Sequence, residues 1–207
     1  EGQGCVCSNG TTTAPHDTER LPECRCFGDN LMDIPGNLSA PVVILNVVGA
    51  GMKTLSPSSL QPYRNTIQDF ALMNVKHLSA IEDGVFHNNL PKLRTIYIDH
   101  APLLVNLSKY VFHASLPALK ILRIVHCGLE EPPNLGYLVT KKPLIMVDLE
   151  NNRITRLRTG SIHVRAEEVI LNYNFIEVVE SRAFKNSQIA KLSLKGNRAL
   201  RALDYDA

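Results

Sequence analysis

The sequence contains no stretch that could cross a membrane and no large excess of charge. Its apolar runs stay well short of the roughly 20 residues that a membrane-spanning helix needs. The formal net charge is only +2, so no polyanionic partner such as nucleic acid is expected. No signal peptide is visible either, and we interpret Glu1 as a mature or trimmed terminus. With 44% hydrophobic residues in 207, the composition is that of a folded protein.

Catalytic motifs are also missing from the sequence. It has no nucleophile elbow, no glycine-rich phosphate loop and no paired-carboxylate cleft. His126 is the base nearest to Cys127 in sequence. Adjacent residues of a strand point to opposite faces of the sheet, so the two are not expected to form a nucleophile–base pair. We interpret Cys127 as a buried, inert thiol. The sequence therefore predicts no catalytic residue, no cofactor and no enzyme activity.

What the chain does contain is a repeated apolar pattern. Each unit has apolar residues at positions one, four and six, and Asn, Cys or a small residue at position nine. The period lies in the roughly 20–29 residue range of leucine-rich repeats. The pattern predicts an α/β leucine-rich repeat solenoid, a horseshoe with a parallel concave β-sheet and one short strand per repeat. About seven units begin at Val42, Ile67, Leu93, Leu119, Leu144, Ala166 and Ile189.

Two further features support stacked repeats. Asn152, Asn174 and Asn197 occupy position nine, where a buried amide can bond loop backbone that has no sheet partner. Another large apolar residue follows the last apolar position of most units by five residues and predicts a spine on the convex side. Its members are Leu60, Phe86, Phe112, Ile162 and Phe184. The fourth unit has residues 130–133, EEPP, instead, so its return segment is expected to be extended.

Four of the five cysteines fall in the first 26 residues, ahead of the first repeat. We predict a disulfide-bonded N-terminal cap over residues 1–41, followed by the array over 42–207. Four cysteines allow three pairings, and their spacing does not select one. A zinc site fits less well, because a C-x-C pair leaves one residue where structural zinc sites usually have two to four. The cysteines are Cys5, Cys7, Cys24 and Cys26.

Three N-x-S/T sequons agree with an oxidising, secretory environment. They lie at Asn9, Asn37 and Asn106, which we predict to carry N-linked glycans. Asn106 lies where the third unit leaves its strand, so a glycan there would stay off the concave centre.

The repeat template also predicts which side chains face solvent on the concave sheet, namely those at positions two, three, five, seven and eight. Their charges form a basic, an acidic and a second basic band, with exposed apolar residues between them. This pattern favours a folded protein partner of complementary charge, although a merely solvated face stays an alternative. The basic residues are Arg94, Lys120 and Arg123, then Lys191 and Lys195, and the acidic ones are Asp148, Glu150, Glu167 and Glu168. The apolar and aromatic ones are Tyr97, Ile121, Ile145, Met146, Ile170 and Tyr173.

His100 and His126 share position eight in adjacent units and are expected to lie side by side. A metal site or a pH switch is conceivable there. The sequence shows no obvious third ligand, so we interpret both as surface residues and predict no metal site.

Several segments resemble the ectodomain of the glycoprotein hormone receptors, the follitropin, lutropin and thyrotropin receptor family. Three units carry one extra residue before their final apolar pair, in the stretches IQDFALMNVKHLSAI, LRTIYIDHAPLLVNL and IAKLSLKGNRALRAL. Further matches, in family order, are CRCFGDNLMDIP, LPALKILRIVHCGLEEPPNL, MVDLENN and AEEVILNYNFIEVVESRAFKNSQIAKLSL. The resemblance covers nearly the whole chain and indicates a divergent member.

The resemblance implies a hormone-binding ectodomain of a G protein-coupled receptor at the extracellular side of the plasma membrane. Its partner would be a secreted cystine-knot glycoprotein hormone heterodimer held on the concave face. More repeats, a hinge and a seven-helix membrane domain would then follow Ala207. The alternative is an extracellular matrix or cell-adhesion protein with the same repeats.

The resemblance also implies particular residue roles. Asp148 stands where the family commonly places an acidic side chain that meets the hormone, and the cap cysteines would pair as Cys5–Cys24 and Cys7–Cys26. The candidate hormone-binding residues are Asp69, Arg94, Tyr97, Asp99, His100, Lys120, Arg123, His126, Asp148, Glu150, Asn151, Glu168, Ile170, Tyr173 and Lys195.

Overall fold

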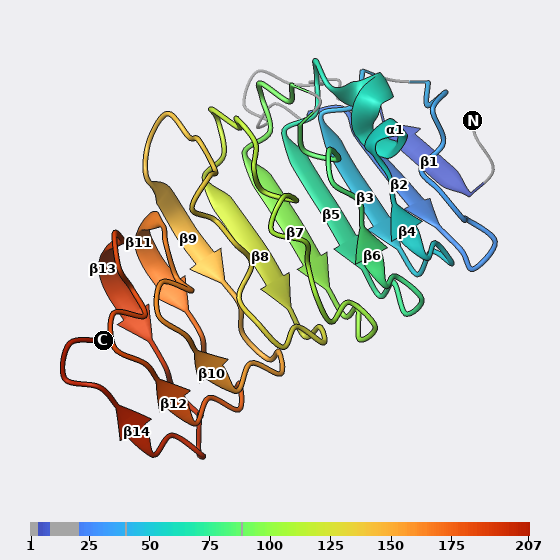
Figure 1. The fold of residues 1–207 in the computed structure, drawn as a ribbon. Helices are drawn as coiled ribbons and strands as arrows, with labels where there is room; N and C mark the ends of the chain where they lie inside the picture. The colour runs from blue at the N-terminus through green and yellow to red at the C-terminus, as the bar shows by residue number, and fades with distance from the viewer. Residues whose placement is uncertain (1–3, 9–20, 40, 88) are drawn as a thin grey trace, which may run out of the picture.

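The computed structural model describes residues 4–8, 21–39, 41–87 and 89–207, which form a curved solenoid (Figure 1). The longer strands are β1 (Cys5–Ser8), β2 (Glu23–Phe27), β3 (Ile44–Val48), β5 (Asp69–Met73), β7 (Thr95–Asp99), β8 (Ile121–Val125), β9 (Leu144–Asp148), β11 (Arg165–Ile170) and β13 (Gln188–Ser193). The two-residue strands are β4 (Thr54–Leu55), β6 (Ala80–Ile81), β10 (Arg156–Leu157), β12 (Val178–Val179) and β14 (Ala202–Leu203). Among the described residues, helix is limited to α1 (Pro57–Leu60) and the 3-10 turn η1 (Gln61–Tyr63).

The longer strands form one nine-stranded sheet in the order β1-β2-β3-β5-β7-β8-β9-β11-β13. Only β1 and β2 are antiparallel, and every later pair is parallel. Each of the seven predicted units contributes one strand to this sheet, which confirms the leucine-rich repeat prediction. Equivalent repeat positions lie opposite one another, as Tyr97 does with Arg123 and Arg123 with Asp148.

The core is a single apolar column running along the array. In β7, for example, Ile96 and Ile98 are fully buried while Thr95, Tyr97 and Asp99 between them reach solvent. This alternation follows from the two-residue period of a strand. It leaves one side of the nine-stranded sheet open, and we call the side chains at positions two, three, five, seven and eight of the repeats the concave face.

The position-nine asparagines form a buried ladder, as predicted. The Asn174 amide donates to the Leu149 and Leu171 carbonyls at 3.0 and 3.1 Å, and its Oδ1 accepts from Ile154 N at 3.2 Å. Asn152 and Asn197 repeat this arrangement one repeat earlier and later. Each amide therefore satisfies backbone groups of two successive repeats where the chain leaves the sheet.

The convex side carries the short strands and the predicted apolar spine. Leu60, Phe86 and Phe112 are buried, with the two phenylalanine rings stacked at 5.4 Å between centroids. Ile162 is also buried, whereas Phe184 is only partly covered near the end of the array. The return segment of the fourth unit, which contains residues 130–133, has no strand or helix, in agreement with its prolines.

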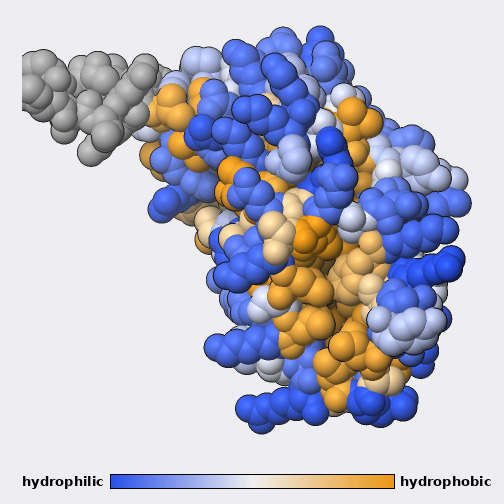
Figure 2. Space-filling view, turned by 90° about the vertical axis from the view of Figure 1, so that its left-hand side faces the viewer, coloured by the Kyte–Doolittle hydropathy of each residue, from blue (hydrophilic) through white to orange (hydrophobic). Residues whose placement is uncertain are grey.

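At the end that carries β13 and β14, apolar side chains are open to solvent (Figure 2). Leu192 is 40% and Leu203 63% exposed, although equivalent residues of inner repeats are buried. Stacking of the next repeat is what buries these positions elsewhere in the array. No helix among the described residues has the length and hydrophobicity to span a membrane.

The cap contributes β1 and β2, and its disulfides differ from those that the family resemblance implies. Cys5 is bonded to Cys26 and Cys7 to Cys24, so the pairing Cys5–Cys24 with Cys7–Cys26 is wrong. The physical reason is the antiparallel β1–β2 ladder, whose register places Cys5 opposite Cys26 and Cys7 opposite Cys24. Because β2 also pairs with β3, the cross-linked hairpin extends the repeat sheet directly.

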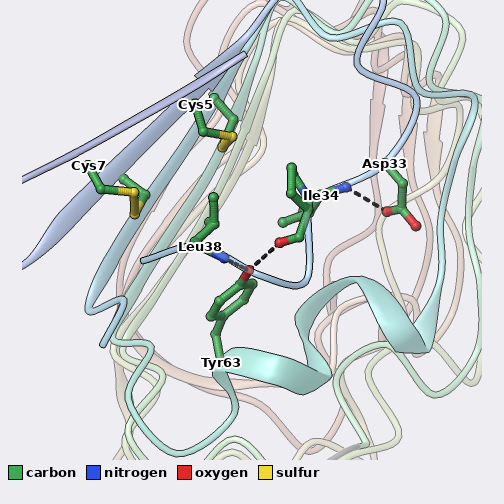
Figure 3. Close-up of a disulfide and its surroundings, with 9 residues drawn as sticks. Cys5, Cys7, Asp33, Ile34, Leu38 and Tyr63 are labelled. Carbon is green, nitrogen blue, oxygen red and sulfur yellow. Dashed lines mark hydrogen bonds between the residues drawn. A yellow bond between two sulfur atoms is a disulfide. The ribbon is translucent and has the colours of Figure 1, made fainter. Parts of the chain in front are cut away.

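A hydrogen-bond network joins residues 33–38, the segment of the cap after β2, to the first repeat (Figure 3). The Tyr63 hydroxyl donates to the Pro35 carbonyl and accepts from Leu38 N at 3.3 Å. Burial raises the pKa of Tyr63, which keeps this hydroxyl a donor. Asp33 accepts from Ile34 N and from the Ser59 hydroxyl, each at 2.7 Å, and so links the segment to α1.

Candidate functional site: the concave face

The concave face is a lattice of side chains at equivalent repeat positions. Position five of successive strands carries Tyr97, Arg123, Asp148 and Ile170, which lie in adjacent strands. Position seven carries Asp99, Val125, Glu150, Asn172 and Lys195 in the same way. Strands about 4.8 Å apart bring such neighbours into direct contact.

Arg123 connects two of the predicted contact residues. Its Nε donates to Asp148 Oδ2 at 3.2 Å, and its guanidinium carbon lies 4.6 Å from the centroid of the Tyr97 ring. Asp148 is only 4% exposed, and its Oδ1 also accepts from Glu150 N at 3.0 Å. Asp148 therefore lies on the predicted face but is covered by Arg123. The prediction that the Asp148 side chain faces solvent is wrong.

Asp99 is the centre of a polar cluster that joins three repeats. Its Oδ2 accepts from the Tyr97 hydroxyl at 2.6 Å, and its Oδ1 lies 2.6 Å from His100 Nδ1 and 2.9 Å from His126 Nδ1. The two imidazole rings stack with centroids 4.6 Å apart, which confirms that these histidines lie side by side. Asn151 Nδ2 lies 3.2 Å from His126 Nε2 and extends the cluster to the next repeat.

The cluster shifts the pKa values of two of its members. Partial burial raises the pKa of Tyr97, and the hydrogen bond to the Asp99 carboxylate raises it further, to about 12. For Asp99, burial opposes the charged form, but the hydrogen bonds from Tyr97 and His126 and the nearby imidazoles outweigh it and lower the pKa. Asp99 is thus held as an acceptor and Tyr97 as a donor.

Position eight has a left-handed backbone in each repeat. His100, His126, Asn151 and Tyr173 have φ between 51° and 56°, and Asn74 has the same conformation. Glycine fills the position in the first and last units, as Gly49 and Gly196. Left-handed residues project their side chains where the chain turns away from the sheet. A row of His, Asn and Tyr side chains therefore follows one edge of the concave face.

The predicted charge bands are present, but ion pairs connect them. Arg94 donates to both carboxylate oxygens of Asp69, with Nη2 2.9 Å from Oδ2. Lys191 Nζ lies 3.6 Å from Glu168 Oε1, which joins the acidic band to the second basic band. These contacts, together with Arg123–Asp148, fix several side chains in place. The charge that stays available to a partner is smaller than the sequence predicted.

Apolar and aromatic side chains remain open on the same face. Ile145 and Tyr173 are each 44% exposed, while Ile121, Met146 and Ile170 are partly buried between their neighbours. Lys195 Nζ lies 5.9 Å from the centroid of the Tyr173 ring. The positions predicted to carry hydrophobic anchors are therefore accessible.

A basic hollow of about 610 Å³ lies where β7, β8 and β9 begin. Pro117, Pro143 and Ile145 supply its apolar part. Its four lysines form no ion pair with a described residue, and Glu167 is the acidic residue at its edge. The lysines are Lys92, Lys120, Lys141 and Lys142. Of these, only Lys120 was predicted as a contact residue, because the others precede the strand positions of the template.

Two of the three predicted glycan acceptors fall on described residues. Asn37 and Asn106 are both exposed, as glycosylation requires, whereas Asn9 lies outside the described residues.

Cys127 is buried, with its Sγ 3.2 Å from the Val125 carbonyl oxygen. Burial raises the pKa of its thiol to about 12. This confirms the prediction of a buried thiol, and a thiol held protonated in this way is a poor nucleophile.

The fold is established by three features of the repeats, namely the repeated strand, the left-handed turn at position eight and the asparagine ladder. The chain folds as a leucine-rich repeat solenoid. The crystal structure of human 5T4 (Wnt-activated inhibitory factor 1, trophoblast glycoprotein) is similar, with a TM-score of 0.51 and 18% identity over 84% of this chain and 76% of that one. No protein-family model matches the chain, and no curated protein sequence is significantly similar to it.

At 18% identity, the likeness to 5T4 shows the fold alone. Leucine-rich repeat solenoids are typical of binding proteins rather than enzymes, and two disulfides are typical of an extracellular domain.

Proposed function

We propose that this leucine-rich repeat domain is the hormone-binding ectodomain of a G protein-coupled receptor. Its concave face holds a secreted cystine-knot glycoprotein hormone heterodimer on the outside of the cell. The membrane and signalling parts lie outside this chain. The choice of hormone class comes from the resemblance of the repeats to the glycoprotein hormone receptors.

The observation that carries the proposal is the accessibility of Ile145 and Tyr173. Each side chain is 44% exposed, on a concave face whose charged side chains are largely held by ion pairs. Aromatic and aliphatic side chains surrounded by polar groups are the usual anchors of protein interfaces. An extended strand face with several such anchors suits a folded partner better than a small molecule, which needs a deep pocket.

The ion pairs on the face also favour a protein partner. Arg94 is held by Asp69 and Arg123 by Asp148 before any partner binds. Prearranged side chains lose less conformational entropy on association, so more of the contact energy appears as affinity. The unpaired lysines around the basic hollow add a region that complements an acidic part of the hormone.

Biolayer interferometry of this protein against a panel of cystine-knot heterodimers from the organism that produces it tests this function. Tyr173→Asn removes an exposed ring and suits the left-handed backbone at this position. If Tyr173 is an anchor, affinity should fall by about tenfold or more. Tyr137→Asn is the matched control, since Tyr137 is 63% exposed but lies in the return segment of the fourth unit.

Saturable binding that is weakened by Tyr173→Asn and unchanged by Tyr137→Asn would support the hormone-receptor function. Absence of binding to every heterodimer by the folded protein would contradict it and favour the matrix or adhesion alternative. Binding that falls only with Tyr137→Asn would keep the hormone but contradict the concave face as its site.

A further inference from the structure

The cluster around Asp99 brings together three side chains that commonly bind transition metals. Asp99 Oδ1, His100 Nδ1 and His126 Nδ1 lie within 4.8 Å of one another. Among the residues that the structure describes, no other three His, Cys, Asp or Glu side chains converge in this way. Asp99 thus supplies the third potential ligand that the sequence did not show beside the two histidines.

We propose that Asp99, His100 and His126 form a binding site for a zinc-class divalent transition-metal ion on the concave face. The site does not depend on hormone binding. It lies on the surface assigned to the hormone, but metal binding and hormone binding can be measured separately.

The ligand set selects the class of metal. Two imidazole nitrogens and one carboxylate oxygen suit Zn²⁺, whereas Ca²⁺ and Mg²⁺ prefer six or more oxygen ligands. Zn²⁺ forms bonds of about 2.0–2.2 Å to such atoms, which places the ligands roughly 3.3 Å apart in tetrahedral geometry. At present His126 Nδ1 is hydrogen-bonded to Asp99 Oδ1 at 2.9 Å, and His100 Nδ1 lies 2.6 Å from the same oxygen. Binding of an ion therefore requires both Nδ1 atoms to be unprotonated, with the remaining ring proton on Nε2, and lengthens the two N–O distances by about 0.4–0.7 Å.

The rings have room for that shift and leave the ion accessible. The side chains of His100 and His126 are 58% and 41% exposed, and that of Asp99 is 18% exposed. Three protein ligands on an open face leave a fourth position for water or for a donor group of a partner. The carboxylate is thus anchored in the sheet, while the two imidazoles can close on an ion from solvent.

Backbone conformation holds the two histidines in place. Both have a left-handed backbone, with φ of 56° for His100 and 51° for His126, at equivalent positions of neighbouring repeats. The parallel register of β7 and β8 places the two turns side by side, and the rings already stack at 4.6 Å. Such fixed ligands lose little conformational freedom when they bind an ion.

Outer groups of the kind found at metal sites are also present. Tyr97 donates to the second oxygen of Asp99 at 2.6 Å, which orients the carboxylate. The side-chain amide of Asn151 lies 3.2 Å from His126 Nε2. If the amide is turned by 180°, its oxygen accepts from Nε2–H, the contact that a histidine bound to metal through Nδ1 requires.

Another histidine pair provides a matched comparison. His87 and His113 also belong to neighbouring repeats, but their rings lie 6.4 Å apart edge to face. His87 Nε2 contacts the Tyr110 carbonyl oxygen at 2.9 Å. Neither ring has a described carboxylate partner, so this pair should not bind the ion.

Isothermal titration of the disulfide-bonded protein with ZnCl₂ at pH 7.5, without chelator, tests the site. We expect saturable binding of one ion per chain. The double variant His100→Asn/His126→Asn keeps residues that tolerate the left-handed backbone and should weaken the affinity at least tenfold. Asp99→Asn should also weaken it, whereas His87→Gln/His113→Gln should leave it unchanged. Thermal unfolding of each variant shows whether it is folded.

A readout in the unaltered protein keeps the test independent of variant folding. On addition of Zn²⁺, the imidazole ring signals of His100 and His126 should shift in ¹H–¹³C spectra, while those of His87 and His113 should stay in place. The site is overturned if the unaltered protein shows no saturable binding, or if folded His100→Asn/His126→Asn binds with unchanged affinity. It is also overturned if the ring shifts occur only at the other histidines.

Discussion

Arg123 on β8 covers Asp148 on β9, and their Nε and Oδ2 atoms are 3.2 Å apart. This contact gives Asp148 a structural role in addition to any role in binding. Removing the carboxylate leaves the guanidinium without its partner and Glu150 N without its acceptor. Charge reversal at Asp148 would therefore disturb the fold, and lost binding in such a variant would not locate the interface.

Asp148→Ala is expected to lower the free energy of unfolding by about 2 kcal/mol, because partly buried groups lose their partners. Urea denaturation measures this. Glu168→Gln is the control, since the Lys191–Glu168 pair is more exposed and its loss should cost less than about 1 kcal/mol. Equal effects of the two changes would mean that burial of Asp148 contributes nothing.

The pKa of Tyr97, raised from 10.0 to about 12, predicts a pH dependence of stability. The unfolded chain releases the phenol proton near pH 10, but the folded chain retains it to about pH 12. The stabilisation is complete below pH 10 and declines as pH rises toward 12. Urea unfolding between pH 9 and about 11 should show this decline, and Tyr97→Phe should reduce its slope.

Nuclear magnetic resonance can test directly whether Asp99 raises the pKa of Tyr97. Asp99 contributes to the raised pKa of Tyr97 through its hydrogen bond and its charge. The Tyr97 ring signal should therefore titrate at lower pH in Asp99→Asn than in the unaltered protein. An unchanged titration would show that the carboxylate does not act on the phenol.

The cysteines predict a definite alkylation pattern. Cys127 is buried with a pKa of about 12, and the other four of the five cysteines form two disulfides. Iodoacetamide at pH 8 should leave the folded protein unmodified. In guanidinium without reductant, intact mass should show one adduct. Two or more adducts would mean that a cap disulfide is open.

The disulfide pairing itself can be read from a non-reduced tryptic digest. Cleavage after Arg25 separates Cys24 from Cys26, and electron-transfer fragmentation can break the chain between Cys5 and Cys7. Cys26 should remain attached to the fragment with Cys5, and Cys24 to the fragment with Cys7. The opposite attachment would contradict the antiparallel hairpin.

The asparagine ladder should contribute measurably to stability. Asn174→Ala leaves the Ile154 N–H without its acceptor and weakens the satisfaction of the Leu149 and Leu171 carbonyls. A loss of at least about 2 kcal/mol in the free energy of unfolding is expected. Asn134→Ala, at an exposed residue with one local bond to Gly136 N, should change it little. A small effect at Asn174 would show that water replaces the amide.

Much of the fold follows from local periodicity, which is why the sequence could predict it. Leu122 and Ile124 point inward because a strand alternates, and the Asn at position nine follows from the turn that ends each strand. The convex spine, with Phe86 on Phe112, is visible as a constant offset along the chain. These features depend on spacing within a repeat and on the stacking of similar units.

Contacts between repeats were harder to predict. The cap disulfides depend on the direction of a hairpin, and the spacing of Cys5, Cys7, Cys24 and Cys26 is the same for either pairing. Asp148 has the parity of an exposed residue, but Arg123 from the preceding strand, β8, covers it. Asp99 joins His100 and His126 only because their left-handed turns stack, and one unit's sequence does not show that. One sequence signal could have identified this cluster, namely an adjacent Asp99–His100 pair followed one repeat later by His126.

The central claim, that the concave face binds the hormone, is tested most directly by a glycan placed on that face. Glu168→Asn with Ile170→Thr creates a sequon at two outward positions of β11, and His113→Asn creates one in the return segment ahead of β8. Mass spectrometry confirms occupancy, and biolayer interferometry measures hormone binding. The account predicts that the β11 glycan abolishes binding while the glycan at position 113 leaves it intact. Undiminished binding with the β11 glycan fully occupied would contradict it.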